Sequence, residues 1–118
     1  MYTPPDHAMA IANNWNIVLA DNEKIYFYNS SASLQGSSTY NSFFSVNEGF
    51  TDPHLLYDSG SDRFIFVIQC GATAVEKIRV CYSLNNNPYA SGFNFYTYDI
   101  VSLTGSTVDY PNIAVSTD

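Results

Sequence analysis

The acidic segment Asp58–Asp62, which reads Asp-Ser-Gly-Ser-Asp, has residue types that can bind a metal ion. Calcium takes about six to eight oxygen ligands, and two carboxylates on a glycine-containing turn can supply some of them. The segment lacks the further acid of an EF-hand loop. A plain hairpin turn, in which Asp58 or Asp62 pairs with Arg63, explains the same residues. We favour the turn and expect no cofactor, with calcium as the alternative.

The two histidines, His7 and His54, occupy matching places, beside Asp6 and directly after Asp52-Pro53. Zinc sites generally need about four ligands, so one pair of histidines makes no site within a single chain. An oligomer would multiply the pair. We favour no metal here.

Residue patterns for catalysis are weak. No Gly-x-Ser-x-Gly segment and no phosphate-binding glycine loop occur in the sequence. A glycosidase-type pair of acids remains an alternative, because the sequence has eleven carboxylates and does not give the distances between them. We therefore lean against an enzyme.

Aromatic residues near expected strand ends are the candidates for ligand binding. Aromatic rings stack on sugar faces and anchor interfaces, but they also fill the gaps between neighbouring repeat units. The candidates are Trp15, Tyr40, Tyr89 and Tyr110.

The two cysteines, Cys70 and Cys81, flank an expected hairpin turn at residues 71–80. A turn centred between Val75 and Glu76 would place them opposite each other, where a disulfide can form. The alternative is two small buried apolar residues, which we favour slightly.

Composition limits the possible partners. The 118 residues carry eleven acids and four bases, a formal charge of −7, which repels nucleic acids and anionic membranes. Charged residues make up 13 % and aromatic residues 16 %, a balance more typical of secreted or surface β proteins. Residues 1–5 lack the basic start and apolar run of a signal peptide. We expect that export information was removed, or that the chain is a fragment of a longer protein.

An Asp/Pro-marked strand start occurs three times, and this self-similarity predicts a repeat architecture. Each copy places an aspartate and a proline before a short apolar run, and we interpret the aspartates mainly as turn caps. The marking residues are Pro5 with Asp6, Asp52 with Pro53, and Asp109 with Pro111. We expect one unit over 1–50, a second over 51–106, and the first strand of a further unit over 107–118.

The strand pattern assigns the chain to the all-β class. Short apolar runs and period-2 alternation dominate, and no segment shows a convincing helical period. Each unit is expected to hold four antiparallel strands, which at about 45 to 55 residues is typical of a β-propeller blade. In the first unit, Tyr40–Val46 is the expected fourth strand and residues 29–39 a serine-rich loop. The expected strands are residues 8–13, 15–20, 24–28, 40–46, 54–57, 63–70, 78–84 and 93–100.

The sequence also resembles the repeats of bacterial secreted β-propeller proteins, over about residues 5–118. The similarity rests on Asp52–Asp58 leading to Arg63-Phe64, on Ser83-Leu84 followed by Asn87-Pro88 and an aromatic strand, and on Asp109–Val115. The resemblance implies a wall-like or ligand-presenting module, often part of a larger extracellular protein.

The match is imperfect, since Asn87 stands where aspartate is common, and Phe64 and Phe93 stand where tryptophan is common.

Two blades do not close a ring, because propellers generally need about four to eight. We therefore expect a non-catalytic structural or binding module of a secreted or surface protein. Its ring would be completed by self-assembly or by further blades of a larger protein. Three copies would give six blades and four would give eight, whereas an open arrangement would give a filament. The alternatives are a lectin-like propeller that binds glycans and a fragment of a propeller hydrolase.

Overall fold

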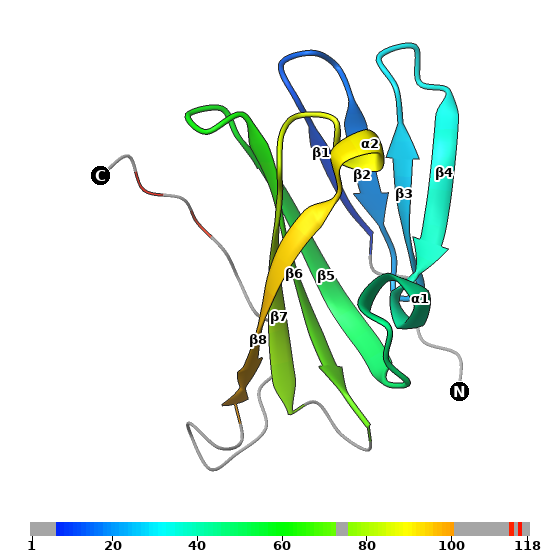
Figure 1. The fold of residues 1–118 in the computed structure, drawn as a ribbon, viewed down its shortest axis with the longest axis vertical. Coiled ribbons are helices and arrows are strands. Elements are labelled where there is room, and N and C mark those ends of the chain that lie inside the picture. Colours follow the sequence, from blue (N-terminus) through cyan, green and yellow to red (C-terminus); the bar gives the residue numbers. More distant parts are fainter. Residues whose placement is uncertain (1–6, 73–75, 101–113, 115, 117–118) are drawn as a thin grey trace.

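The computed structural model describes residues 7–72, 76–100, 114 and 116, and shows a mostly β protein with two four-stranded antiparallel sheets (Figure 1). The first sheet contains β1 (Ala8–Ile11), β2 (Ile17–Ala20), β3 (Lys24–Tyr28) and β4 (Leu34–Thr39). The second contains β5 (Gly49–Asp58), β6 (Arg63–Gly71), β7 (Lys77–Ser83) and β8 (Phe93–Asp99). In each sheet the strands lie side by side in chain order.

Two short helices interrupt this pattern. Helix α1 (Tyr40–Phe44) joins β4 to β5, and α2 (Pro88–Ser91) lies between β7 and β8. Figure 1 shows them at opposite ends of the sheets, with α1 at the lower end and α2 at the upper end. Each sheet is therefore a simple meander, and the chain passes from one sheet to the other through α1.

The first strands of the two sheets pack against each other. Strand β5 contacts β1 and, less extensively, β2. Small side chains permit this close approach, since Ala10 of β1 and Ala20 of β2 are both buried. The hydrophobic core extends from here to Phe44 and Phe66, which belong to α1 and β6.

Strand alternation follows the period of two that the sequence indicated. Buried and half-buried residues alternate along β2, β3 and β7, as expected for strands with one face on a core. Strand β6 is buried along nearly its whole length, because it lies between β5 and β7 and because Phe64, Phe66 and Ile68 belong to the core. Strand β8, at the edge, is exposed from Asn94 to Asp99.

The expected strand at Tyr40–Val46 was wrong, because these residues start with helix α1. Thr39 caps the helix, accepting a hydrogen bond from the Ser42 N–H at 3.3 Å. The aromatic residues at positions 40, 43 and 44 have the i, i+3, i+4 spacing that puts side chains on one helix face.

The fourth strand of the first sheet is instead β4, within the segment expected to be a loop. Its serine-rich sequence has a weak strand propensity, but backbone pairing with β3 outweighs it. The register pairs Lys24 with Thr39 and Phe27 with Gly36. Most of β4 is exposed, as suits an edge strand with small polar side chains.

Candidate functional site

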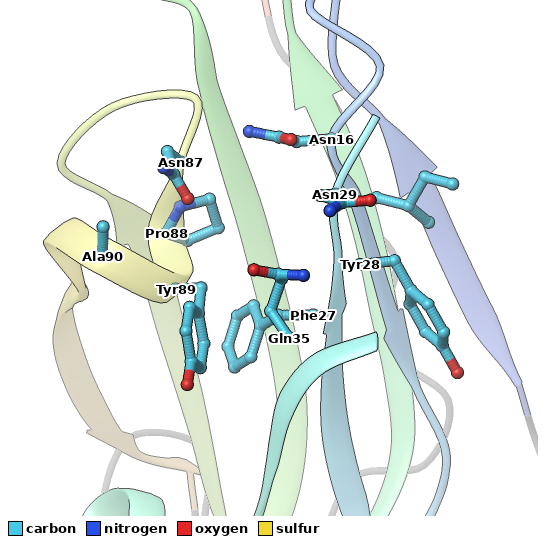
Figure 2. A pocket seen from close by; sticks show the side chains of 10 residues that line it. Asn16, Phe27, Tyr28, Asn29, Gln35, Asn87, Pro88, Tyr89 and Ala90 are labelled. Atoms are coloured by element: carbon cyan, nitrogen blue, oxygen red, sulfur yellow. The ribbon is translucent and has the colours of Figure 1, made fainter. Parts of the chain in front are cut away.

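A cleft of about 250 Å³ lies between the first sheet and helix α2 (Figure 2). One wall comes from the loop before β2, the strand β3 and the start of β4. The other wall comes from the first residues of α2 and the asparagine before it. Ten residues line it: Asn16, Ile17, Phe27, Tyr28, Asn29, Gln35, Asn87, Pro88, Tyr89 and Ala90.

Asparagine side chains set the shape of the upper part of this cleft. Asn16 Nδ2 donates to the backbone carbonyl of Asn86 at 3.0 Å, which links the β1–β2 loop to the segment before α2. Asn29 Oδ1 accepts from the N–H groups of Ser31 and Ser33, and so orders the turn between β3 and β4. The Asn29 bonds order one wall locally, whereas the Asn16 bond spans 70 residues and joins the two walls.

Aromatic rings form the lower part of the cleft. Phe27 is buried, and its ring centroid lies 5.9 Å from that of Tyr89 and 6.2 Å from that of Phe93. Tyr89 remains 54 % exposed, so one side of its ring is packed while much of it faces solvent. Figure 2 shows the Tyr89 and Phe27 rings next to each other below the amide of Gln35.

Gly36 of β4 makes the close approach of Tyr89 possible. A Cβ atom added at Gly36 would lie 2.5 Å from Cε1 of Tyr89, well inside van der Waals contact. Position 36 therefore needs a glycine for the ring to lie where it does.

The four aromatic candidates fall in different environments. Tyr89 lines the cleft. Trp15 is 68 % exposed and directly precedes Asn16, in a left-handed backbone conformation with φ of 70°. Tyr40 is buried, and its hydroxyl lies 2.6 Å from the Asp21 carbonyl and 2.9 Å from the Lys24 carbonyl. Tyr110 lies outside the described residues.

Tyr40 is thus a structural residue of α1. Burial raises the pKa of its hydroxyl, with the nearby Asp21 charge adding to the effect, so the group stays neutral and donates to the turn between β2 and β3. The sequence placed this residue among the binding candidates because its position in α1 was not apparent.

The Asp58–Asp62 segment is a hairpin turn between β5 and β6. Asp58 accepts hydrogen bonds from the Gly60 N–H at 3.0 Å and the Ser61 hydroxyl at 2.5 Å. Asp62 accepts from the Tyr57 hydroxyl and from Asn86 Nδ2. Arg63 is the backbone partner of Asp58 in the β5–β6 register, but its guanidinium lies over Tyr82, 5.7 Å from the ring centroid. The Asp58 carboxylate is therefore used within the turn, and that of Asp62 joins the turn to β5 and to the segment before α2.

The aspartate and proline that mark the second repeat lie inside a strand. Asp52 has a left-handed φ of 54°, and the β5–β6 register shifts between Thr51 and His54. The pair thus forms a β-bulge in β5, with Pro53 buried, and the strand starts three residues earlier, at Gly49. Asn22 Oδ1 accepts from the Asp52 N–H at 3.2 Å. Asp6, Asp109 and Pro111 lie outside the described residues.

Neither histidine stands in a cluster of metal ligands. His7 is exposed just before β1, and His54 is half-buried in β5. Over residues 7–72, 76–100, 114 and 116, no group of three or more His, Cys, Asp or Glu side chains is placed to hold a metal ion.

The two cysteines are free and buried. Cys81 pairs across the strands with Phe66, and Cys70 pairs with Lys77, so the register does not place the thiols opposite each other as a cross-strand disulfide requires. Burial raises the pKa of Cys70 to about 11 and that of Cys81 to about 12. The two residues are the small buried apolar side chains that the sequence favoured.

A charged cluster that the sequence did not indicate lies around Glu48. Its two carboxylate oxygens accept from Lys77 Nζ at 2.8 Å and from Arg79 Nη2 at 3.0 Å. Burial alone would raise the pKa of Glu48, but these hydrogen bonds outweigh it and hold the pKa below its usual value. The partners are 29 and 31 residues away in the sequence, so no local pattern relates them.

Comparison of the chain with models of protein families found no match, and neither did comparison with curated proteins or with solved structures. Within the described part of the chain, no helix has the length and apolar character needed to cross a membrane.

Proposed function

We propose that the chain is a non-catalytic β-propeller module of a secreted or surface protein, in which each four-stranded sheet is one blade. The observation that carries the proposal is the strand order. Both sheets are antiparallel meanders in chain order, and the most extensive strand contact between the two sheets is that of their first strands, β1 and β5. This arrangement suits blades whose first strands lie nearest a common axis.

A β-sandwich is the competing architecture, because it also packs two antiparallel sheets. Sandwiches commonly use Greek-key connections, in which the chain returns to an earlier strand. Among the described strands each one pairs with its neighbour in sequence, and the single passage between sheets runs through α1. The strand order therefore favours two blades over a sandwich.

Exposed aromatic residues on the second sheet support completion by further blades. Tyr96 and Tyr98 lie on the same face of β8 and are 55 % and 47 % exposed. Concentrated apolar surface of this kind marks an association site. Since a ring needs about four to eight blades, this surface would contact a blade of another copy or of a longer protein.

A hydrolase is less well supported. Glu23 and Glu48 line one shared hollow, but Glu48 is bound to Lys77 and Arg79. A catalytic acid needs a raised pKa so that it carries a proton near neutral pH, whereas the pKa of Glu48 is lowered. Glu48 therefore does not suit the role of a general acid in hydrolysis.

Solution mass measured by light scattering, together with binding of a hydrophobic dye, tests the proposal. A particle of about three or four times 13.1 kDa would support self-assembly into six or eight blades. A monomer that binds the dye would support completion by a longer protein. A monomer that unfolds cooperatively and binds no dye would overturn the proposal.

Paired variants sharpen the same measurement. Tyr98→Lys places a charge on the exposed surface of β8 and is expected to dissociate an assembly or to abolish dye binding. Leu34→Lys is the control, because Leu34 is 54 % exposed but lies on β4, away from that surface. Equal effects of the two variants would contradict a role for β8.

A further inference from the structure

The cleft beside α2 combines one open aromatic face with several uncharged amides. Tyr89 is held from one side by Phe27 and by the backbone at Gly36, yet it remains half exposed. A ring fixed in this way loses little conformational freedom when a ligand stacks on it. Such a surface suits a ligand with an apolar face.

The side-chain amides of the cleft supply its hydrogen-bonding groups. A side-chain amide both donates and accepts hydrogen bonds, which matches the hydroxyl groups of a sugar. Gln35 is exposed, and its Nε2 makes only a long bond of 3.3 Å to the Ser33 carbonyl. Asn87 is exposed as well, and among the described residues no hydrogen bond holds its side chain. Figure 2 shows both amides beside the space above the Tyr89 ring.

The walls are held together before any ligand arrives. The bond from Asn16 to the Asn86 carbonyl connects the two sheets at the rim of the cleft. Pro88 is buried at the start of α2 and fixes the backbone directly before Tyr89. In a preformed site of this kind, little binding free energy is lost in ordering the side chains and loops that contact the ligand.

The charge and the size of the cleft limit the class of ligand that it can bind. None of the ten described residues that line the cleft is an Asp, Glu, Lys, Arg or His. A carboxylate or phosphate group would therefore find no counter-charge there. The volume of about 250 Å³ is below the roughly 300–1,000 Å³ of sites for drug-sized ligands. It suits a single ring.

We propose that this cleft binds one ring of a neutral saccharide, stacked on Tyr89 and hydrogen-bonded by Gln35 and Asn87. The ring belongs to a free sugar or to a longer glycan whose other units remain in solvent. This binding site goes beyond the proposed blade architecture and does not depend on it.

The test is an NMR titration of the ¹⁵N-labelled full chain with four neutral probes: methyl glucoside, methyl galactoside, methyl mannoside and N-acetylglucosamine. Glucuronic acid is the charged comparison. At least one neutral probe is expected to shift the side-chain amide signals of Gln35 and Asn87, and glucuronic acid is expected to bind more weakly. No shift with any neutral probe, or tighter binding of glucuronic acid, would overturn the proposal.

Variants with a matched control locate the site. Tyr89→Ala is expected to weaken binding by about tenfold or more. Tyr96→Ala removes a ring of nearly the same exposure, 55 % against 54 %, on β8 outside the cleft, and is expected to leave binding unchanged. An equal loss in both variants would contradict the assignment.

Gly36→Ala is the second, independent variant. The added methyl group displaces the Tyr89 ring without removing it, so binding is expected to fall while the ring is still present. Retained affinity in this variant, with the thermal unfolding curve unchanged, would show that the position of Tyr89 does not matter. The sugar titration reports on the cleft, whereas solution mass reports on the blades, so either proposal can fail alone.

Discussion

Glu48 and Arg79 form an ion pair of 3.0 Å between side chains that are only 9 % and 7 % exposed. Arg79 lies over two aromatic rings, 5.0 Å from the Phe44 centroid and 5.9 Å from that of Phe95. Its Nη1 also donates to Thr97 Oγ1 at 2.9 Å. The pair therefore joins the segment after α1 to β7 and β8, at the point where the chain enters the second sheet.

Replacing Glu48 by Gln is expected to destabilise the protein strongly. The change leaves the buried Arg79 without a counter-charge, and breaking such a pair costs about 3–5 kcal/mol of the free energy of unfolding. The Nε atom of Arg79 is already buried without a hydrogen-bond partner among the described residues, so the guanidinium depends on the bonds of its two Nη atoms. Urea unfolding at pH 7 measures the loss.

Glu23→Gln is the control for the same charge change. Glu23 is exposed on the β2–β3 turn, so its replacement is expected to alter the free energy of unfolding by no more than about 0.5 kcal/mol. Comparable losses in the two variants would show that net charge, and not the Glu48–Arg79 pair, governs stability.

Stability is expected to fall in acid, chiefly because of two partly buried carboxylates, Glu48 and Asp21. Hydrogen bonds from Lys77 and Arg79 outweigh burial and lower the pKa of Glu48 in the folded state. At Asp21, bonds from the N–H groups of Glu23 and Lys24 likewise outweigh burial and lower its pKa. A lowered folded-state pKa stabilises the protein above the unfolded-state pKa, and this stabilisation is lost as the pH falls through the folded-state value.

Urea unfolding at pH 7, 5 and 3 measures this dependence. The wild type is expected to lose stability mainly below about pH 5, near the pKa of an unfolded carboxylate. Glu48→Gln should give a shallower profile, because one of the carboxylates with a lowered folded-state pKa is gone. A profile as steep as that of the wild type would contradict the role assigned to Glu48.

Regular apolar strands were predictable from the sequence, whereas the edge strand β4 of the first sheet was not. Residues 24–28 form β3 with the expected bounds, because alternation and β propensity agree there. Strand β4 has neither signal, since its serines and glycine pair with β3 only once the hairpin closes. The aromatic residues of α1 satisfy strand propensity and helical spacing at once, and the threonine cap at position 39 settles the choice.

The candidate cleft was predictable only in part. Tyr89 carries a recognisable aromatic signal near a proline-marked break, and it does line the cleft. Asn16 and Gln35 carry no such signal, because exposed amides occur throughout this sequence. Asn16 reaches the cleft because the β1–β2 loop meets the segment before α2, through a contact between residues 70 positions apart.

Tyr40→Phe is expected to lower the free energy of unfolding by about 1–2 kcal/mol. The hydroxyl donates within the β2–β3 turn, close to the carbonyls of Asp21 and Lys24, and its loss leaves these acceptors without that donor. Tyr98→Phe is the control, since Tyr98 is exposed on β8. Thermal unfolding of both variants tests the difference, and equal stabilities would argue against an anchoring role for Tyr40.

Both thiols are expected to resist modification in the folded protein. Cys70 and Cys81 are buried, and burial raises their pKa values to about 11 and about 12, so little thiolate forms near neutral pH. Ellman's reagent at pH 8 should titrate no thiol before unfolding and two per chain in guanidinium. Detection of no thiol after unfolding would instead reveal a disulfide.

Trp15→Asn is expected to stabilise the protein by about 0.5–1 kcal/mol. Trp15 has a φ of 70°, a left-handed conformation that is unfavourable for a bulky side chain and readily adopted by asparagine. Because the indole is 68 % exposed, its removal sacrifices little buried apolar area. Leu84→Asn is the control, an exposed apolar residue whose φ is not left-handed, and it should bring no gain. A loss of stability in Trp15→Asn, measured by urea unfolding, would mean that the indole makes contacts that outweigh the cost of its backbone conformation.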